Sequence, residues 1–327
     1  MCILVSTVVL AAFTAPSEKL SLEDALKEIE RVEGKVFRKS KAPNSPIVGV
    51  NLTTRKLPSG WLKVLSALPE LTYVNLLGAE FPEEDLKHLA ALPELAELEL
   101  GGPAVRDIAL KEVGKLKKLQ WLTVGGADVT DEGIKLLATL TDLEILNLGR
   151  SKRVKGENFG VLRGLRRLRK LQLSNTSVTD AGMQQIGQLA QLHELELGGT
   201  KITDVGLTHL VQLNELRSLD LGYRKPDFQP GVGENISDAG LAHLGKLKKL
   251  EHLFLISPKI TDRGVASLKG LQELKGLWLN DTGITDQALE HLKGLKKLEV
   301  LGFSRTKVSA AGFKKLKEVL PKLEEEE

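Results

Sequence analysis

Leucine positions repeat along this chain with a period of 24 residues. The clearest unit, residues 192–215, reads LHELELGGTKITDVGLTHLVQLNE, with the frame L-x-x-L-x-L followed by T-D-x-G-L-x-x-L-x-x-L. The last apolar position of L-x-x-L-x-L recurs at eleven places, spaced by 24 or 25 residues except for one gap of 34. These places are Leu52, Leu76, Leu100, Val124, Leu148, Leu173, Leu197, Leu221, Leu255, Leu279 and Phe303. Such regular spacing predicts a repeat architecture rather than several globular domains.

Each unit has two halves with different hydrophobic periods. The L-x-L segment alternates with period two, which predicts a short strand with one face inward. Apolar residues three apart, as at Leu207, Leu210 and Leu213, predict a short helix with one buried face. A Thr-Asp pair before this helix is expected to accept the free N–H groups of its first turn. The pair occurs at Thr130-Asp131, Thr179-Asp180, Thr203-Asp204, Thr261-Asp262 and Thr285-Asp286, with Ser237-Asp238 as a variant.

One unit alone leaves both of its flanks exposed to water, so neighbouring units must cover them and stability is shared along the stack. Strands stack roughly 4.8 Å apart, whereas a helix is roughly 10 Å wide. The helical side of the stack is therefore expected to be the longer one. The sequence predicts a curved molecule with its strands on the concave face.

The frame LxxLxL…ITDxGLxxLxxL resembles the leucine-rich-repeat family, in the TDxGL variant seen in many bacterial repeat proteins and, more loosely, in eukaryotic F-box repeat proteins. The resemblance covers residues 47–320 and implies an α/β leucine-rich-repeat solenoid (a horseshoe) of eleven stacked β-α repeats, with parallel strands on the concave face. It also implies a role in protein recognition without an active site. Three units depart from the T-D pair, at Phe81-Pro82-Glu83, Arg106-Asp107 and Lys155-Gly156-Glu157.

The two ends of the chain differ from the repeats. Residues 21–32 are predicted to form a helix with Ser21 as its N-cap, and residues 36–38 a short strand. Residues 16–46 are therefore interpreted as an N-terminal capping segment in front of the repeat domain at 47–320. At the other end, Pro321 is expected to stop the last helix, and residues 321–327 are interpreted as a solvated acidic tail.

The first fifteen residues carry an apolar run from Ile3 to Phe13 followed by small residues. This run is similar to the core of a secretory signal peptide, so residues 1–15 predict an extracytoplasmic or secreted protein. No basic residue precedes the run, and a clear A-x-A cleavage site is missing. The alternative is an apolar N-terminal strand or tail of a cytoplasmic protein. The run is too short for a transmembrane anchor in the mature chain.

Composition narrows the functional classes. The only cysteine is Cys2, which excludes a disulfide framework and a cysteine-based zinc site. No P-loop, HExxH, GxSxG or dinucleotide motif occurs, so we expect no enzyme activity, no cofactor and no metal. Residues 150–170 hold nine basic side chains and one acidic one. The repeat frame divides them between two opposite edges without interleaved aromatics, which disfavours a nucleic-acid partner.

The alternation within each strand predicts two columns of outward-facing residues across the concave face. They run from Gly49 to Val300 and from Asn51 to Gly302, and they place Phe254 and Trp278 side by side on adjacent strands. The one long insertion, within residues 222–234, follows the strand that ends at Leu221. We expect the binding site there, at Phe254, Trp278, His252, Asp220, Tyr223 and Phe228.

This site is interpreted as a contact for another protein. The alternative function is an extracytoplasmic carbohydrate-binding or adhesion protein that uses the same aromatic pair. A structural alternative also remains open, in which the pair only packs beneath the inserted loop as a satellite core.

Overall fold

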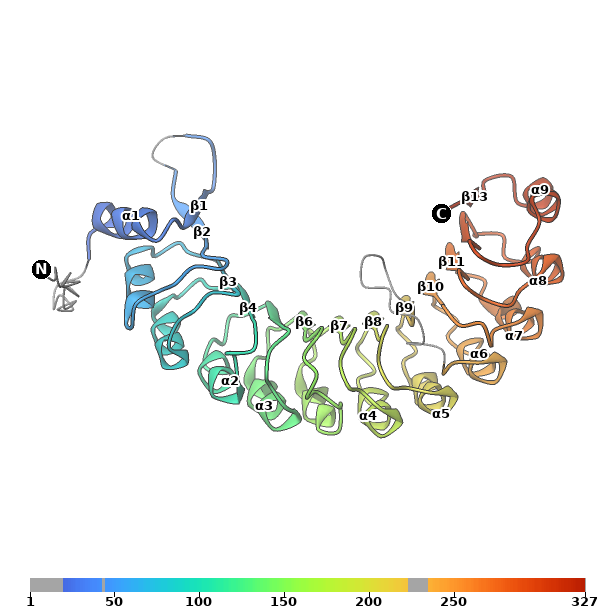
Figure 1. The fold of residues 1–327 in the computed structure, drawn as a ribbon, viewed down its shortest axis with the longest axis horizontal. Coiled ribbons are helices and arrows are strands. Elements are labelled where there is room, and N and C mark those ends of the chain that lie inside the picture. The colour runs from blue at the N-terminus through green and yellow to red at the C-terminus, as the bar shows by residue number, and fades with distance from the viewer. Residues whose placement is uncertain (1–19, 43–44, 223–234, 327) are drawn as a thin grey trace, which may run out of the picture.

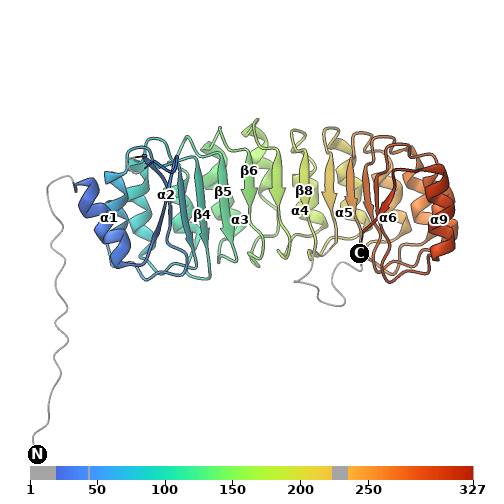
Figure 2. The same ribbon diagram turned by 90° about the horizontal axis from the view of Figure 1, so that it is seen from above.

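The computed structural model describes residues 20–42, 45–222 and 235–326. These residues form a curved solenoid with short strands along the concave inner face and helices along the convex outer face (Figure 1). Seen from above, the strands follow one another along the length of the molecule, with the helices behind them (Figure 2). The predicted horseshoe of stacked strand–helix units is confirmed.

The strands of the described chain are β1 (Lys35–Arg38), β2 (Ile47–Asn51), β3 (Tyr73–Leu77), β4 (Glu97–Gly101), β5 (Trp121–Gly125), β6 (Ile145–Asn147), β7 (Lys170–Gln172), β8 (Glu194–Glu196), β9 (Ser218–Asp220), β10 (His252–Phe254), β11 (Gly276–Trp278), β12 (Val300–Gly302) and β13 (Glu324–Glu325). The α-helices are α1 (Leu22–Arg31), α2 (Asp107–Val113), α3 (Asp131–Lys135), α4 (Asp180–Ile186), α5 (Asp204–Leu207), α6 (Asp238–Leu244), α7 (Asp262–Ala266), α8 (Asp286–Leu292) and α9 (Ala310–Val319). The 3₁₀ helices are η1 (Trp61–Ala67), η2 (Glu83–Ala91), η3 (Leu136–Thr139), η4 (Phe159–Gly164), η5 (Thr208–Gln212) and η6 (Ser267–Gly270).

The strands of the described residues form one sheet whose strand order follows chain order. The eleven repeat strands, β2 to β12, pair in parallel and in register, so Leu195 of β8 lies between Leu171 and Leu219. The predicted strand before the repeats is β1, which pairs antiparallel with β2. At the other end β13 pairs in parallel with β12. Part of the segment predicted to be a solvated tail therefore extends the sheet instead.

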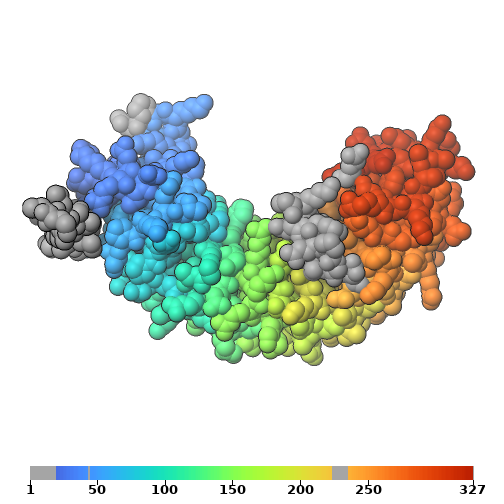
Figure 3. Space-filling model, in the orientation of Figure 1, coloured from blue at the N-terminus to red at the C-terminus, as the bar shows by residue number. Residues whose placement is uncertain are grey.

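A continuous apolar core lies between the sheet and the helices. In the unit around β9, the inward side chains are at most 3% exposed: Leu207, Leu210, Leu213, Leu216, Leu219 and Leu221. Full burial of each such side chain contributes roughly 2 kcal/mol. Ala25 and Ile29 of α1 cover one end of the core, and Leu316, Leu320 and Leu323 close the other. The concave side is visibly hollowed in the space-filling view (Figure 3).

The short helix predicted in each unit is present, and it is α-helical in some units and 3₁₀ in others. Units that have the Asp of the repeat frame, with or without a Thr or Ser before it, begin with α-helical turns. The units of η1, η2 and η4 have 3₁₀ turns alone. These three 3₁₀ helices also have no side-chain cap at their N-termini. The 3₁₀ helix is a tighter, short-range element that commonly replaces a full α-turn in such connections. The departures from the T-D pair therefore change the local helix type without interrupting the stack.

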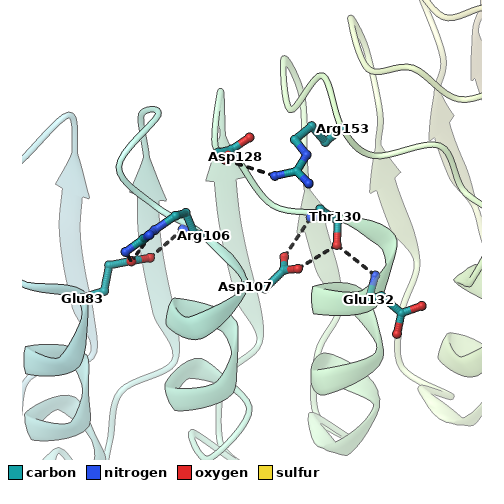
Figure 4. Close-up of polar contacts among 7 residues, drawn as sticks. All are labelled: Glu83, Arg106, Asp107, Asp128, Thr130, Glu132 and Arg153. Atoms are coloured by element: carbon teal, nitrogen blue, oxygen red, sulfur yellow. Dashed lines mark hydrogen bonds and ion pairs between the residues drawn. The ribbon is translucent and has the colours of Figure 1, made fainter.

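The Thr and the Asp of a T-D pair have different partners in most units, with Thr179 as a Thr that makes no side-chain cap bond. Thr203 caps its own helix, since its Oγ1 accepts from the N–H of Val205 at 3.2 Å. Asp180 instead reaches the next unit, where it accepts from the N–H of Thr203 at 2.8 Å and from its hydroxyl at 2.7 Å. The expectation that the Thr or the Asp accepts from the first turn of its helix is confirmed for Thr203, whereas Asp180 bonds to the next unit. Figure 4 shows the same arrangement for Asp107 and Thr130.

This contact recurs along the stack and forms a ladder of aspartates between successive units. The pairs are Asp107–Thr130, Asp180–Thr203, Asp204–Ser237, Asp238–Thr261, Asp262–Thr285 and Asp286–Ser309. The position two residues after each Asp lies against the preceding Asp, because a Cβ on Gly206 would come 2.5 Å from Asp180 Oδ1. One unit has Ala288 there and keeps its Asp262–Thr285 bonds at 2.7 Å. The frame therefore requires a small residue at this position.

Glu83 replaces the Asp in a unit that departs from the frame. Its Oε1 accepts from the backbone N–H of Arg106 at 2.6 Å, and its Oε2 accepts from the Arg106 guanidinium (Figure 4). The longer side chain of Glu83 thus binds the guanidinium of Arg106, at the position where other units have the hydroxyl of a Thr or Ser. The ladder keeps its geometry with a different pair of side chains.

Candidate functional site

The two predicted columns cross the concave face in the expected register. The first column is Gly49, Tyr73, Glu97, Trp121, Ile145, Lys170, Glu194, Ser218, His252, Gly276 and Val300. The second is Asn51, Asn75, Glu99, Thr123, Asn147, Gln172, Glu196, Asp220, Phe254, Trp278 and Gly302. Because all of these positions belong to one paired sheet, their spacing is fixed by the core beneath them.

Phe254 and Trp278 form a parallel stack on the concave face. Their ring centroids are 3.8 Å apart and the ring planes differ by 8°. The indole lies low over the sheet, since a Cβ on Gly276 would come 2.4 Å from its ring and a Cβ on Gly302 2.7 Å. The sequence alone had indicated that both aromatic side chains are exposed. In the structure both are half-buried. The glycines on either side are what allow the ring to lie flat.

The two polar residues predicted beside the stack differ in their availability. His252 is half-buried, and its ring lies 6.2 Å from that of Trp278. Asp220 is only 5% exposed, and its Oδ1 accepts from the N–H of Gly222 at 2.9 Å. Asp220 lies opposite Phe254 in the register but fixes the end of its own strand. Asp220 therefore has a structural hydrogen bond within its own strand end, and its expected role in the contact stays a prediction.

The acidic C-terminal segment also reaches the aromatic stack. Trp278 Nε1 donates to Glu326 Oε2 at 3.1 Å, across the intervening strand β12. The indole N–H is thereby satisfied on the side away from Phe254. This contact joins residues 48 positions apart and was not predicted from the sequence. The other two predicted site residues, Tyr223 and Phe228, lie outside the described residues, as does the segment 1–15.

A second aromatic group lies at the other end of the concave face. Phe37 and Tyr73 contact each other above Gly49, with ring centroids 6.1 Å apart. Trp121 is 40% exposed and lies two strands further along the same column. This group was not predicted from the sequence. The signal was present, because Tyr73 and Trp121 occupy the same outward-facing column of the repeat frame.

Glu97 lies between Tyr73 and Trp121 in that column. Its exposed carboxylate has no hydrogen bond or ion pair with any described residue. Glu99, on the same strand, instead accepts from the Tyr73 hydroxyl at 3.1 Å and from Asn75 Nδ2 at 2.9 Å. Burial, together with the charges of Glu99 and Glu97, raises the pKa of the Tyr73 phenol, which keeps it a hydrogen-bond donor.

The basic residues of 150–170 do not converge on one site. Arg153 pairs with Asp128 at 3.2 Å on one edge of the stack, and Arg167 pairs with Asp142 at 2.9 Å on another unit. Lys170 faces the concave side, where Glu194 and Glu196, against the opposing effect of burial, raise its pKa. Three of the nine basic side chains are thus paired with carboxylates at separate places in the stack.

The described residues show neither a metal site nor a membrane-spanning helix. They hold no group of three or more His, Cys, Asp or Glu side chains placed to bind a metal. No helix among them has the length and apolar character needed to cross a bilayer.

Comparisons with known proteins agree with the fold. A family model described as leucine rich repeat matches residues 166–223. An internalin of Listeria monocytogenes is similar over 93% of this chain and 94% of its own, with 19% identity and a TM-score of 0.53. A leucine-rich-repeat protein of Leptospira interrogans is similar over 81% of this chain and 68% of its own, with 22% identity and a TM-score of 0.54.

A third solved structure, the TLR13–ssRNA13 complex, is similar over 80% of this chain but 36% of its own, with 24% identity and a TM-score of 0.55. No curated protein matches the chain. At these identities the likeness concerns the fold. The chain is a leucine-rich-repeat solenoid, a fold that serves generally as a scaffold for protein–protein interaction and is typically non-catalytic.

Proposed function

We propose that this leucine-rich-repeat protein is a non-catalytic scaffold that binds another protein through its concave face. One observation carries the proposal: Phe254 and Trp278 stack on that face, on strands whose neighbours in the same column are polar or glycine. A few anchor residues, often aromatic ones such as Trp, supply most of the binding energy at protein interfaces. Stacking on each other and on the glycines beneath holds these two rings in place before a partner arrives.

The half-buried His252 extends the proposed contact with a polar group beside the Trp278 ring. Apolar anchors with a few polar neighbours suit a specific interface, because the polar groups fix the orientation of the partner. We therefore assign Phe254, Trp278 and His252 to the contact. Tyr223 and Phe228 of the insertion stay assigned to it on the sequence alone.

We also assign the repeats to the TDxGL variant. The aspartate ladder supports this assignment, because the Thr, the Asp and the small residue of that frame all take part in the same contact between neighbouring units. An F-box relationship gains no support from the described N-terminal segment, whose one helix, α1, covers the end of the core.

A carbohydrate-binding or adhesion function is the alternative. Sugar rings stack on open aromatic faces, whereas one face of Phe254 and one of Trp278 are already used in their mutual contact. This geometry favours the protein partner. A glycan array separates the two functions, because a protein-binding scaffold gives no glycan signal.

An extracytoplasmic location accompanies the proposal and rests on the apolar run at residues 3–13 alone. Mass spectrometry of the protein from its native compartment tests it. We expect an N-terminus near residues 15–17; Met1 or Cys2 retained on a cytoplasmic protein would contradict export.

The function is tested by locating the contact of a co-purified partner with tryptophan fluorescence. The chain has three tryptophans, of which Trp61 is buried and Trp121 and Trp278 lie on the concave face. In the Trp121→Phe variant, we expect the purified partner to protect Trp278 from acrylamide quenching. Unchanged quenching at saturating partner would place the contact elsewhere and contradict the proposal.

A further inference from the structure

The N-terminal half of the concave face combines an exposed aromatic ring with an unpaired carboxylate. Glu97 and Trp121 are directly opposite each other on β4 and β5, so their side chains leave the sheet one strand spacing apart. Trp121 is 40% exposed, and Glu97 is exposed without a partner among the described residues. Adjacent strands lie about 4.8 Å apart. One cation can therefore contact the indole face and the carboxylate together.

The surroundings hold this pair open. On the far side of Glu97, Tyr73 is occupied by its hydrogen bonds to Glu99 and Asn75. Both carboxylate oxygens of Glu99 therefore already accept hydrogen bonds within the protein, and Glu97 is the carboxylate on that strand that can accept from a ligand. On the far side of Trp121 the column continues with Ile145, which is half-buried and carries no charge. The site thus has one open carboxylate beside one open aromatic face.

The acidic charge of the concave face favours a positively charged ligand. The outward positions of the two columns carry five carboxylates, of Glu97, Glu99, Glu194, Glu196 and Asp220, against one lysine, Lys170. The whole chain, in contrast, has a formal charge of +3. An acidic face on a basic chain attracts a basic group and repels phosphates. This charge distribution disfavours RNA as the occupant.

We propose that Trp121 and Glu97 form a subsite for an arginine side chain of the protein partner. A planar guanidinium stacks on an indole and donates two parallel hydrogen bonds to a carboxylate, which an ammonium does less well. The subsite deepens the proposed function and rests on it for the nature of the partner. It lies six strands from Trp278, or roughly 29 Å along the sheet at 4.8 Å per strand. A partner that engages both places must present an extended surface.

The direct test is calorimetric titration of the full chain with an acetylated hexa-arginine peptide, with hexa-lysine alongside. We expect Trp121→Ala and Glu97→Gln each to weaken hexa-arginine binding about tenfold. The matched control is Glu194→Gln, which removes the same charge from the same column but lies in the Lys170 network. It should change the affinity less than threefold, and hexa-lysine should bind more weakly than hexa-arginine.

Equal losses from Glu97→Gln and Glu194→Gln would reduce the effect to general acidity and overturn the subsite. Unchanged binding by Trp121→Ala, equal binding of hexa-lysine, or tighter binding of single-stranded RNA would also overturn it. The variant Phe254→Ala/Trp278→Ala separates the two proposals, because it should bind hexa-arginine like the wild type. If a protein partner needs Phe254 and Trp278 but not Glu97, this inference fails while the proposed function stands.

Discussion

Asp180 accepts two hydrogen bonds from Thr203, one from its backbone N–H at 2.8 Å and one from its hydroxyl at 2.7 Å. The same hydroxyl accepts from Val205 N–H, so one side chain joins the unit behind it to the helix that it starts. The repeat signature is therefore a contact between units. A unit without a neighbour would leave half of these groups unpaired, which links local helix formation to stacking.

The first prediction concerns this ladder. Asp180→Ala removes both acceptors and leaves the N–H of Thr203 without its partner, so we expect a loss of about 1–3 kcal/mol in the free energy of unfolding. The matched control is Asp142→Ala, which breaks an exposed ion pair with Arg167 and should cost less than about 1 kcal/mol. Urea denaturation monitored by circular dichroism measures both. Equal losses would show that the ladder adds nothing beyond surface charge.

The second prediction concerns close approach between units. A Cβ on Gly182 would lie 2.1 Å from the carbonyl oxygen of Lys155 in the preceding unit, and this backbone atom cannot move aside. Gly182→Ala should therefore destabilise the protein by about 1–3 kcal/mol through overpacking, despite the gain of about 1 kcal/mol in helix propensity.

Gly294→Ala provides the control, because nothing lies within 4 Å of its added Cβ. Its effect should stay within about 0.5 kcal/mol, as for most surface changes. A Gly182→Ala variant as stable as the Gly294→Ala variant would mean that the units are less tightly stacked than described.

The third prediction concerns the unit that uses glutamate. Glu83 is 8% exposed and accepts from the backbone N–H of Arg106 as well as from its guanidinium. Glu83→Ala should cost about 1–3 kcal/mol, because it leaves that N–H unpaired. Arg106→Ala keeps the backbone bond to Glu83 and removes a guanidinium that is itself largely exposed, so it should cost less than Glu83→Ala. Thermal melting of both variants gives the comparison, and the reverse order would contradict the assigned roles.

The fourth prediction concerns pH. The hydrogen bonds from the N–H and the hydroxyl of Ser309 lower the pKa of Asp286 below its usual 3.8. Asp131 accepts from backbone N–H groups of the next unit and from no hydroxyl, and burial raises its pKa above 3.8. Carbon-detected NMR titration should find the two carboxyls on opposite sides of 3.8, and Ser309→Ala should move Asp286 part of the way back.

The two shifts have opposite consequences for stability. The folded pKa of Asp286 is depressed, so its contribution is present above 3.8 and is lost as the pH falls through the folded value. The folded pKa of Asp131 is raised, so its contribution is present below 3.8 and is lost as the pH rises through the folded value. Asp131→Asn should therefore abolish the loss of stability as the pH rises, and should leave the loss of stability as the pH falls, which comes from Asp286. Unfolding curves between pH 2 and 6 measure both, a range of roughly two units on either side of an aspartate pKa.

The sequence predicted the solenoid, its register and the Phe254–Trp278 neighbours, because one spacing rule decides which residues face the core. It did not predict the partner of each Asp, since a T-D pair before a helix also fits capping of that same helix. The contact between Trp278 and Glu326 was missed for a different reason: an acidic run indicates solvation and carries no register. Trp121 and Glu97 stood in the predicted column, but only the structure showed that Glu97 is unpaired while Glu99 is bonded.

The central claim is recognition through the concave face, and the most direct measurement is the affinity of a purified partner for Phe254→Ala/Trp278→Ala. We predict binding weaker by roughly several hundred-fold, since two aromatic anchors of about 2 kcal/mol each sum to about 4 kcal/mol and each 1.4 kcal/mol is tenfold, with a melting temperature close to that of the wild type. The control, Ile108→Ala/Val205→Ala, truncates exposed side chains on two of the outer helices and should bind normally. Unchanged affinity in the aromatic variant, or a loss only in the control, would contradict the claim.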